Sequence, residues 1–390
     1  MTHFVRPLAL AEGLDPAEFD VHFHAPSRFH AYLAGKNFHI GLLDSMPGEQ
    51  FLANLARGAP LFPLETLRRY VKEDRELISQ IRPDLVIGDM RLSLPLSARL
   101  ENVKSAVIMN AYWSPYAKRR SIIPELPITR IVPPRFLGPI YRFTEPFAFA
   151  IHVAGMNRLR KEFGLPPLPP DLRVMYTEGN YVLYPDVPEF VPTDGAPSSH
   201  RYVGVCEWTV PMPKPEWWGA AMADRRPRVF VSLGSSGAVR IMADLWKALS
   251  AMPVAVLISN SGRDVGSFDR GAYLANLLPF TETAAACDLV ISHGGSGGLY
   301  PAMAAGTPVL GVPSNADQQL SAAILEENGA GLGVRAEEAS AKRLRSAVER
   351  ILAESKFRTR ARGWAATFAK YNSVKLFRDF LAGAGLKPNR

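Results

Sequence analysis

A glycine-dense turn directly after a histidine is the segment of the sequence best suited to bind a phosphate. The strand-like segment 288–292, with an apolar centre, leads into His293. The turn that follows consists of Gly294, Gly295, Ser296, Gly297 and Gly298. Glycines let backbone N–H groups approach an anion without interference from a Cβ atom, and a helix that starts there adds the positive end of its dipole. The segment favours a diphosphate ligand, although such turns also occur as tight connections in many α/β proteins.

Polar residues after two other apolar segments complete this candidate site. Gly234 and the hydroxyl residues Ser235 and Ser236 follow the segment 228–233, and Asp317 and Gln318 come after the segment 308–312. Because the carboxyl ends of parallel strands meet at one edge of a sheet, we expect these groups to face the same ligand as His293, whose ring can donate an N–H. Taken singly, a histidine at a strand end is usually structural and an Asp-Gln pair fits a solvated turn. Their joint order and spacing favour the site.

A histidine near the start of the chain and an aspartate at the end of an apolar segment have the chemistry of a general base and its partner. The imidazole pKa lies near neutrality, and a buried carboxylate can orient the ring and stabilise its protonated form. The candidates are His3 and Asp89, which follows residues 84–88. Judged by residue type and position alone, a terminal histidine and a strand-end cap are the better explanations.

Strand-like and helix-like segments alternate in both halves of the chain, which indicates parallel sheets covered by helices. The expected strands cover residues 20–25, 84–88, 105–109, 228–233, 254–258, 288–292 and 308–312. The expected helices cover residues 62–81, 299–305 and, as several amphipathic segments, 341–381. Residues 121–170 carry many prolines and aromatics and are expected to form an irregular lobe. Within this lobe, residues 136–155 fit an amphipathic helix, either buried in the domain or lying on a membrane.

The composition indicates a globular protein of two domains. The chain has 390 residues, of which 47% are hydrophobic and 21% charged, and no apolar run is long enough to span a membrane. The net charge of +8 suits an anionic ligand or lipid surface, but the densest basic runs, residues 118–120 and 225–228, are short and do not indicate nucleic-acid binding. Two cysteines without a disulfide framework, and an N-terminus without a signal peptide, favour the cytoplasm.

The run of residues 288–318 resembles the donor-binding signature of the UDP-glycosyltransferase family. In that family a His-x-Gly-x-x-Ser/Thr turn is followed by a Gly-x-Pro strand and an Asp-Gln pair. The resemblance implies the α/β fold class GT-B, in which two Rossmann-like parallel-sheet domains face each other across a cleft. It also implies that His293 and the backbone of 294–298 hold the donor diphosphate, and that Asp317 and Gln318 bind the sugar hydroxyls.

The loop 234–236 also matches the family, in its loop after the first strand of the nucleotide domain, but three other positions depart from the pattern. Gly298 stands where the family usually has a hydroxyl residue, which removes a phosphate contact. Pro301 replaces the glutamate that many members use to grip the ribose, and Leu277 replaces the tryptophan on which plant enzymes stack the base. The nucleotide, whether UDP, dTDP or GDP, therefore stays open. Phe280 is a candidate for contact with the base, with a core aromatic as an equally good explanation.

The resemblance also assigns the catalytic pair. The family places its base in a Gly-His-x-x-x-Pro segment, which this chain matches at His3 and Pro7, and its partner aspartate at a strand end comparable to Asp89. The resemblance thus implies that His3 takes the acceptor proton and that Asp89 orients it. Tyr112 and Trp113 follow a strand in the domain where such enzymes meet their acceptors, and they are candidates to stack on one, with buried packing as the alternative.

The predicted domain organisation follows the family. Residues 1–207 form an N-terminal acceptor-binding Rossmann-like domain, 208–228 a linker, 229–364 the C-terminal nucleotide-sugar-binding domain, and 365–390 a helix that crosses back to the N-terminal domain. The strand that family members have before the catalytic histidine is missing from this sequence. We therefore expect either that the natural product begins about 15–20 residues earlier or that the chain is a damaged transferase.

We predict an inverting glycosyltransferase that moves a hexose from a nucleotide-diphosphate sugar, with a UDP-sugar favoured, to the hydroxyl of a small-molecule or lipid acceptor. The sequence has no Asp-x-Asp motif, and although His22 and His24 share a strand face no third ligand is apparent, so neither a metal nor a cofactor is expected. A nucleic-acid partner is not expected, while peripheral membrane contact and the oligomeric state stay open. The alternatives are an inactive sugar-nucleotide-binding protein with a truncated N-terminal domain, and a sugar-nucleotide epimerase of the same fold.

Overall fold

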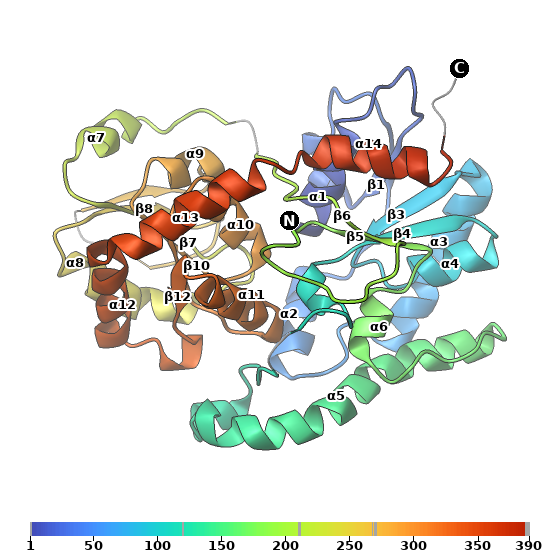
Figure 1. Cartoon of the computed structure of the whole chain (residues 1–390), viewed down its shortest axis with the longest axis horizontal. Coiled ribbons are helices and arrows are strands. Elements are labelled where there is room, and N and C mark those ends of the chain that lie inside the picture. Colours follow the sequence, from blue (N-terminus) through green and yellow to red (C-terminus); the bar gives the residue numbers. More distant parts are fainter. Residues whose placement is uncertain (1, 119–120, 210–211, 267, 269–270, 387–390) are drawn as a thin grey trace. The chain divides into compact units, whose positions relative to one another are not determined.

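The chain folds into two compact units, each built around a parallel sheet (Figure 1). The structure, a computed structural model, describes all residues except 1, 119–120, 210–211, 267, 269–270 and 387–390. Unit 1 comprises Met1–Ser121, Ile140–Trp208 and Tyr371–Arg390, and unit 2 comprises Ile122–Pro139 and Thr209–Lys370. Parallel strands joined by helices in both units confirm the predicted α/β fold class.

Unit 1 contains a four-stranded parallel sheet with the strand order β3-β4-β5-β6. Its strands are β3 (Leu85–Asp89), β4 (Lys104–Ile108), β5 (Tyr181–Tyr184) and β6 (His200–Tyr202). A separate parallel pair joins β1 (His22–Ala25) to β2 (His39–Leu42). The predicted strands at β1, β3 and β4 are confirmed. Helices cover both faces of β4. This explains why the sequence of the strand does not alternate between apolar and polar residues.

The helices of unit 1 include one that the sequence analysis predicted only in part. They are α1 (Thr2–Ala11), α2 (Gly48–Ala56), α3 (Leu64–Ile81), α4 (Leu94–Leu100), α5 (Pro134–Glu162), α6 (Leu172–Tyr176) and α14 (Ser373–Gly383), with the 3-10 turns η1 (Ser27–Tyr32) and η2 (Ala111–Trp113). The first six residues of α5 group with unit 2. The irregular lobe expected over 121–170 is wrong, because α5 is one continuous helix. Pro139 and Pro146 each remove a helical hydrogen bond without ending it.

The two ends of the chain meet in the core of unit 1. Leu10 of α1 and Phe377 and Phe380 of α14 belong to the same buried apolar cluster as Ile108 of β4. The ring of Phe380 also packs edge-on against Tyr181 of β5, with centroids 5.2 Å apart. The last helix therefore helps to bury the sheet that carries Asp89.

Unit 2 contains a six-stranded parallel sheet with the strand order β12-β11-β10-β7-β8-β9. Its strands are β7 (Arg228–Ser232), β8 (Ala255–Ser259), β9 (Ala272–Ala275), β10 (Leu289–Ser292), β11 (Val309–Gly311) and β12 (Gly331–Gly333). The strand order reverses between β7 and β10, which pair in register from Val229↔Leu289 to Ser232↔Ser292. In open α/β sheets, ligands bind beyond the strand ends at such a switch point. The loops 234–237 and 293–298 both start there.

Among the residues that the structure describes, seven α-helices belong to unit 2. They are α7 (Trp218–Ala223), α8 (Met242–Ser250), α9 (Phe280–Ala285), α10 (Ser296–Ala304), α11 (Ala316–Glu327), α12 (Ala341–Ala353) and α13 (Ser355–Phe368), with the 3-10 turns η3 (Pro127–Arg130), η4 (Val239–Ile241) and η5 (Ala336–Glu338). The four predicted strands of this half are confirmed. α10 starts at Ser296 instead of the predicted Leu299, because the glycines that weigh against a helix lie in its first turn.

Candidate active site

The ring of His293 lies between two glycines at the switch point of unit 2. A Cβ atom on Gly295 would come within 2.7 Å of His293 Nε2, and one on Gly234 within 3.3 Å of His293 Cε1. Gly294 adopts a φ of +78°, which disfavours other residues, and its N–H donates to Ser292 Oγ at 3.1 Å. The glycines of both loops are therefore needed to accommodate the histidine as well as to expose backbone N–H groups.

The start of α10 has the properties of an anion-binding site. Gly295 is the N-cap residue, and no side chain caps this end of the helix. The carbonyl of Gly295 accepts the N–H groups of Gly298 and Leu299, which sets the first turn. The remaining N–H groups of the turn and the helix dipole favour a negative charge in front of residues 294–297.

The environment of His293 keeps its ring neutral. Burial lowers the pKa of His293 despite the opposing charge of Asp317, and with the added effect of Arg263 the pKa is about 4. Its Nδ1 atom is shielded from solvent and has no hydrogen-bond partner among the described residues. A buried polar atom without a partner is costly, and this one lies on the side of the ring that faces Gly234, while Nε2 faces Gly295 at the start of α10. A neutral imidazole can still donate one N–H to a phosphate oxygen.

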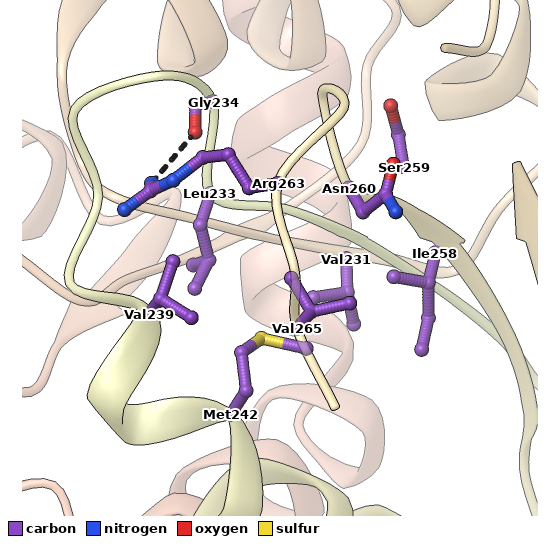
Figure 2. Close-up of a pocket in the computed structure, with 10 residues that line it drawn as sticks. All are labelled: Val231, Leu233, Gly234, Val239, Met242, Ile258, Ser259, Asn260, Arg263 and Val265. Carbon is purple, nitrogen blue, oxygen red and sulfur yellow. Dashed lines mark hydrogen bonds between the residues drawn. The ribbon is translucent and has the colours of Figure 1, made fainter. Parts of the chain in front are cut away.

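Arg263 was not predicted, yet it organises the loop after β7. Its Nη1 atom donates to the carbonyl oxygens of Gly234 at 3.1 Å and Gly237 at 2.8 Å. Figure 2 shows the guanidinium reaching to Gly234 across a small pocket, which is otherwise lined mainly by apolar side chains such as Val231 and Met242. Burial lowers the pKa of Arg263, but it stays a cation at neutral pH. The sequence pattern of the turn gave no signal for it, because it follows β8, outside the motif.

The Asp-Gln pair begins α11, and its two members have different surroundings. Gln318 is buried, and its Oε1 accepts from Ser314 N at 2.9 Å and Ser314 Oγ at 3.0 Å. Its Nε2 faces Ser236 Oγ at 3.3 Å, so the amide ties α11 to the loop after β7. Asp317 is half-buried in the first turn of α11. Contact of either residue with a sugar stays a prediction, and for Gln318 it requires an exchange of these internal partners.

Phe280, predicted as a contact to the base or as a core aromatic, packs within unit 2. It is the first residue of α9, and its ring lies edge-on to Phe230 of β7 with centroids 5.1 Å apart. A Cβ atom on Gly298 would lie 3.8 Å from its Cζ atom, so the ring is close to the start of α10. The ring is half-buried. Contact with a base stays a prediction.

His3 and Asp89 are brought together in unit 1. His3 Nδ1 lies 2.6 Å from Asp89 Oδ1, and the His3 side chain is 51% exposed while that of Asp89 is fully buried. Since an ionised carboxylate can only accept, this short separation places the ring proton on Nδ1. Nε2 of His3 is then the free basic atom.

Arg6 shares the Asp89 carboxylate and was not predicted. Its Nε donates to Asp89 Oδ2 at 2.7 Å and its Nη2 to Oδ1 at 2.8 Å, while Nη1 donates to Asn110 Oδ1 at 2.7 Å. Burial would raise the pKa of Asp89, but the charges and hydrogen bonds of Arg6 and His3 outweigh it and hold the pKa below its ordinary value. The Asp89 carboxyl group therefore stays ionised beside the Arg6 guanidinium. The i, i+3 spacing of His3 and Arg6 on one helix was the available signal.

The ends of three neighbouring strands supply this network. Asp89 ends β3, Asn110 follows β4, and Asp186 follows β5. Asn110 Nδ2 donates to Asp186 Oδ2 at 3.3 Å, and the Ala111 N–H donates to the same oxygen at 2.7 Å. The network explains how a buried carboxylate is held rigid beside an exposed base. Only the pairing of the strands shows that these residues meet.

Tyr112 and Trp113, the predicted acceptor contacts, are buried in η2. Tyr112 is 1% exposed and Trp113 is 8% exposed. The indole of Trp113 packs edge-on against the ring of Tyr176 in α6, with centroids 5.3 Å apart. The alternative of buried packing therefore describes both side chains in this structure. Their contact with an acceptor stays a prediction.

Pairing of β1 with β2 gives His22 partners that the sequence did not reveal. His22 and His39 are register partners with stacked rings, and their Nε2 atoms lie 3.3 and 2.9 Å from the two carboxylate oxygens of Asp20. The exposed trio has ligand atoms within 4.8 Å of one another. The statement that no third ligand accompanies His22 is therefore corrected, although His24 is not part of this group.

Comparisons with known proteins match both units. A family model described as the C-terminal domain of erythromycin biosynthesis protein CIII-like proteins covers residues 241–371. The chain is similar to a PGL/p-HBAD biosynthesis glycosyltransferase of Mycobacterium tuberculosis H37Ra, with 39% identity over 369 residues that cover 94% of this chain and 86% of that protein. It is also similar to a PGL/p-HBAD biosynthesis rhamnosyltransferase of Mycobacterium bovis BCG, with 37% identity, 95% of this chain and 82% of that protein.

Solved structures share the fold at low sequence identity. The spinosyn rhamnosyltransferase SpnG complexed with thymidine diphosphate superimposes with a TM-score of 0.67 and 18% identity. The match covers 97% of this chain and 96% of that chain. At this identity the likeness concerns the arrangement of the strands and helices.

Proposed function

Because the chain belongs to the UDP-glycosyltransferase family and is a glycosyltransferase with the GT-B fold, we propose that it transfers a hexose from a nucleotide-diphosphate sugar to an acceptor hydroxyl with inversion. The observation that carries this proposal is the 2.6 Å hydrogen bond between His3 and Asp89, which leaves His3 Nε2 as an accessible base. A protein that only bound sugar nucleotides would not need such a pair.

In the proposed reaction, unit 1 activates the acceptor. His3 Nε2 takes the proton of the acceptor hydroxyl while its oxygen bonds to the anomeric carbon of the sugar. The bond from that carbon to the phosphate oxygen breaks, and the nucleoside diphosphate leaves with the electron pair. Asp89, kept ionised by Arg6, stabilises the imidazolium that forms. A single displacement of this kind inverts the anomeric configuration.

Unit 2 is proposed to stabilise the leaving diphosphate. Neutral His293 donates a ring N–H, and the N–H groups of 295–297 together with the dipole of α10 meet the developing charge. Arg263, which holds the loop after β7, adds a positive charge near the same turn. Asp317 is proposed to bind the sugar hydroxyls. These groups stabilise the negative charge of the diphosphate, which a divalent cation does in metal-dependent enzymes. The proposed transfer is therefore metal-independent and uses no cofactor beyond the donor.

The proposed substrates follow the relatives and the family. The SpnG structure contains thymidine diphosphate and the family pattern suggests UDP, so UDP- and dTDP-hexoses are the proposed donors. The named relatives belong to PGL/p-HBAD biosynthesis, which supports a small-molecule or lipid acceptor, with peripheral contact to a membrane. Cys206 and Cys287 are buried free thiols, which supports a reducing, cytoplasmic location.

Transfer assays on the full chain test the proposal. UDP- and dTDP-hexoses are incubated with a panel of phenols and lipid alcohols, and the released nucleoside diphosphate and the anomeric configuration of the product are measured. We expect an inverted product, a kcat about 100- to 10,000-fold lower for His3→Ala, and unchanged donor affinity in that variant. Donor binding without transfer by the native chain would favour the inactive alternative. Epimerised donor in place of a glycoside would favour the epimerase.

A further inference from the structure

The C-terminal half of α5 is anchored in unit 1 by an ordinary buried face. Phe149, Val153, Met156 and Leu159 are each at most 9% exposed. Arg160 on the same half is also buried and forms an ion pair with Glu178. Figure 1 shows α5 as one long helix whose earlier turns extend away from α6. The buried face accounts for the position of the helix.

A second apolar face of α5 is open to solvent. Its members recur at intervals of three and four residues, which places them on one side of a helix. They are Phe136 (59% exposed), Ile140 (62%), Phe143 (77%), Phe147 (73%) and Ile151 (61%). We call these five residues the α5 stripe. It spans about 22 Å at the helical rise of about 1.5 Å per residue.

Such a stripe is unusual for a protein surface in contact with water alone. Five of the eleven large hydrophobic side chains that are exposed among the described residues lie on this single helix. Isolated exposed apolar residues are normal, whereas a contiguous row indicates an interaction surface. Packing within unit 1 does not explain the row, because the buried face of α5 is formed by other residues.

The charges on α5 indicate an anionic partner. The exposed charged residues before its last residue are all basic, namely Arg135, Arg142, Arg158 and Lys161. The guanidinium of Arg135 lies 4.8 Å from the ring centre of Phe136, so charge and apolar surface adjoin. Glu145, the acidic residue in this stretch, is half-buried and electrostatically coupled to Arg173. A row of Phe and Ile beside basic residues is the pattern of helices that lie in the headgroup region of a bilayer.

We propose that the α5 stripe binds the surface of a membrane that contains anionic lipids. Phe143 and Phe147 enter the boundary between headgroups and acyl chains, and Arg135 and Arg142 contact lipid phosphates at that level. The helix lies along the surface, since no described helix has the length and apolar character to cross a bilayer. Membrane binding by α5 does not require sugar transfer. Only its use, to bring the enzyme close to a lipid acceptor, rests on the proposed transferase function.

Vesicle co-sedimentation with the full chain tests this proposal. The probes are vesicles of phosphatidylcholine alone and of phosphatidylcholine with about 30% phosphatidylglycerol, at low and at physiological salt. We expect the native chain to bind the anionic vesicles, and Phe143→Ser/Phe147→Ser to bind them at least about tenfold more weakly. Arg135→Gln/Arg142→Gln is expected to lose the preference for anionic over neutral vesicles and most of the salt dependence.

A matched control distinguishes vesicle binding by the α5 stripe from nonspecific adsorption through any exposed apolar side chain. Ile40→Ser/Leu42→Ser removes two other exposed apolar side chains, 41% and 63% exposed, from unit 1 and is expected to bind vesicles like the native chain. Equal binding of anionic vesicles by the native chain and by Phe143→Ser/Phe147→Ser, the stripe variant, would overturn the proposal. Absence of vesicle binding by the native chain would overturn it as well. So would a native dimer that the stripe variant converts to a monomer without any vesicle binding. Donor affinity measured on every variant reports on the transferase proposal independently and also verifies folding.

Discussion

Asp89 is a carboxylate that contacts both the charged Arg6 and the ring of His3, and this determines how it can act on His3. Arg6 engages both carboxylate oxygens, so part of the negative charge is neutralised before the imidazolium forms. Besides stabilising the imidazolium with its remaining charge, Asp89 holds the ring proton on Nδ1 and fixes the ring in place. Its contribution is therefore expected in the chemical step more than in substrate binding.

Replacing Asp89 by Asn tests this division. Asp89→Asn should lower kcat by about 100- to 10,000-fold, because the amide neither stabilises the imidazolium nor enforces the tautomer with a free Nε2. Donor affinity from calorimetry should stay within about twofold. The control is Asp84→Asn, an exposed aspartate just before the same strand, which should leave both quantities unchanged. An equal loss of turnover and donor affinity would indicate a structural role for Asp89.

His293 makes the stability of unit 2 sensitive to acid. The unfolded chain takes up its proton near pH 6.5, whereas the folded protein does so only near pH 4. The unfolded state therefore binds more protons between these values, and the native state loses stability as the pH falls from 6.5 to 4, with no further loss below. The shift corresponds to at most about 3 kcal/mol.

Denaturation at two pH values tests this dependence. Urea unfolding of the native chain and of His293→Gln is measured at about pH 7 and about pH 4.5, and the loss in the free energy of unfolding is compared. The variant should lose less stability than the native chain by up to about 3 kcal/mol, because its side chain does not titrate. The same loss in both proteins would show that His293 is not held neutral.

At the level of the secondary-structure elements, the beginning of α10 is the proposed binding site for the diphosphate. Its N-cap is a glycine without a side-chain cap, and the His293 ring occupies the space that a Cβ atom would need. β7 and β10 place the two glycine loops next to each other at the point where the strand order reverses. The site is thus a property of two strand ends and one helix start.

Adding a methyl group at the N-cap tests this arrangement. Gly295→Ala puts a Cβ atom within 2.7 Å of His293 Nε2, so the ring must move. Affinity for UDP or dTDP should fall about tenfold or more, and stability by about 1–3 kcal/mol from overpacking. Gly363→Ala in α13, where no atom lies within 4 Å of the added Cβ, is the control and should bind nucleotide normally. Unaltered nucleotide affinity in Gly295→Ala would place the diphosphate elsewhere.

At the scale of the whole molecule, the chain passes into unit 2 twice, for residues 122–139 and 209–370, and then returns to finish unit 1. The segment Tyr371–Arg390 groups with the first unit, and Phe377 and Phe380 of α14 fill its core. Helix α14 therefore completes the core of the unit that contains His3 and Asp89. The proposed donor site lies in unit 2, to which this helix does not belong.

A core substitution in α14 should reveal this independence. Phe377, 3% exposed, changed to alanine should destabilise unit 1 by about 3–5 kcal/mol because it leaves a cavity. Nucleotide affinity at low temperature, a property of unit 2, should be unchanged. Lys375→Ala on the exposed side of the same helix should alter neither. Loss of nucleotide binding in Phe377→Ala would show that the two units do not fold separately.

Local patterns in the chain were sufficient to predict the glycine turn after His293, whose role in donor binding stays a prediction, and several of the strands. The run of glycines after His293 and the apolar segments before it are short-range features, and the strand at 288–292 and the start of a helix followed from them. The same holds for β3 and for the choice of His3 and Asp89, which rested on family motifs of a few residues. Short strands such as β9 and β12 were missed because four and three residues carry little periodicity.

Contacts between distant segments were decided only in three dimensions. Asp89, Asn110 and Asp186 follow one another at the ends of three parallel strands, and Arg6 of α1 joins Asp89 to Asn110. Arg263 reaches the loop after β7 from the loop after β8. Burial of Tyr112 and exposure of the α5 stripe likewise depend on which face of each element is covered. An amphipathic pattern shows that a helix has an apolar face, but its neighbours determine whether that face is buried, and neighbours are set by the tertiary fold.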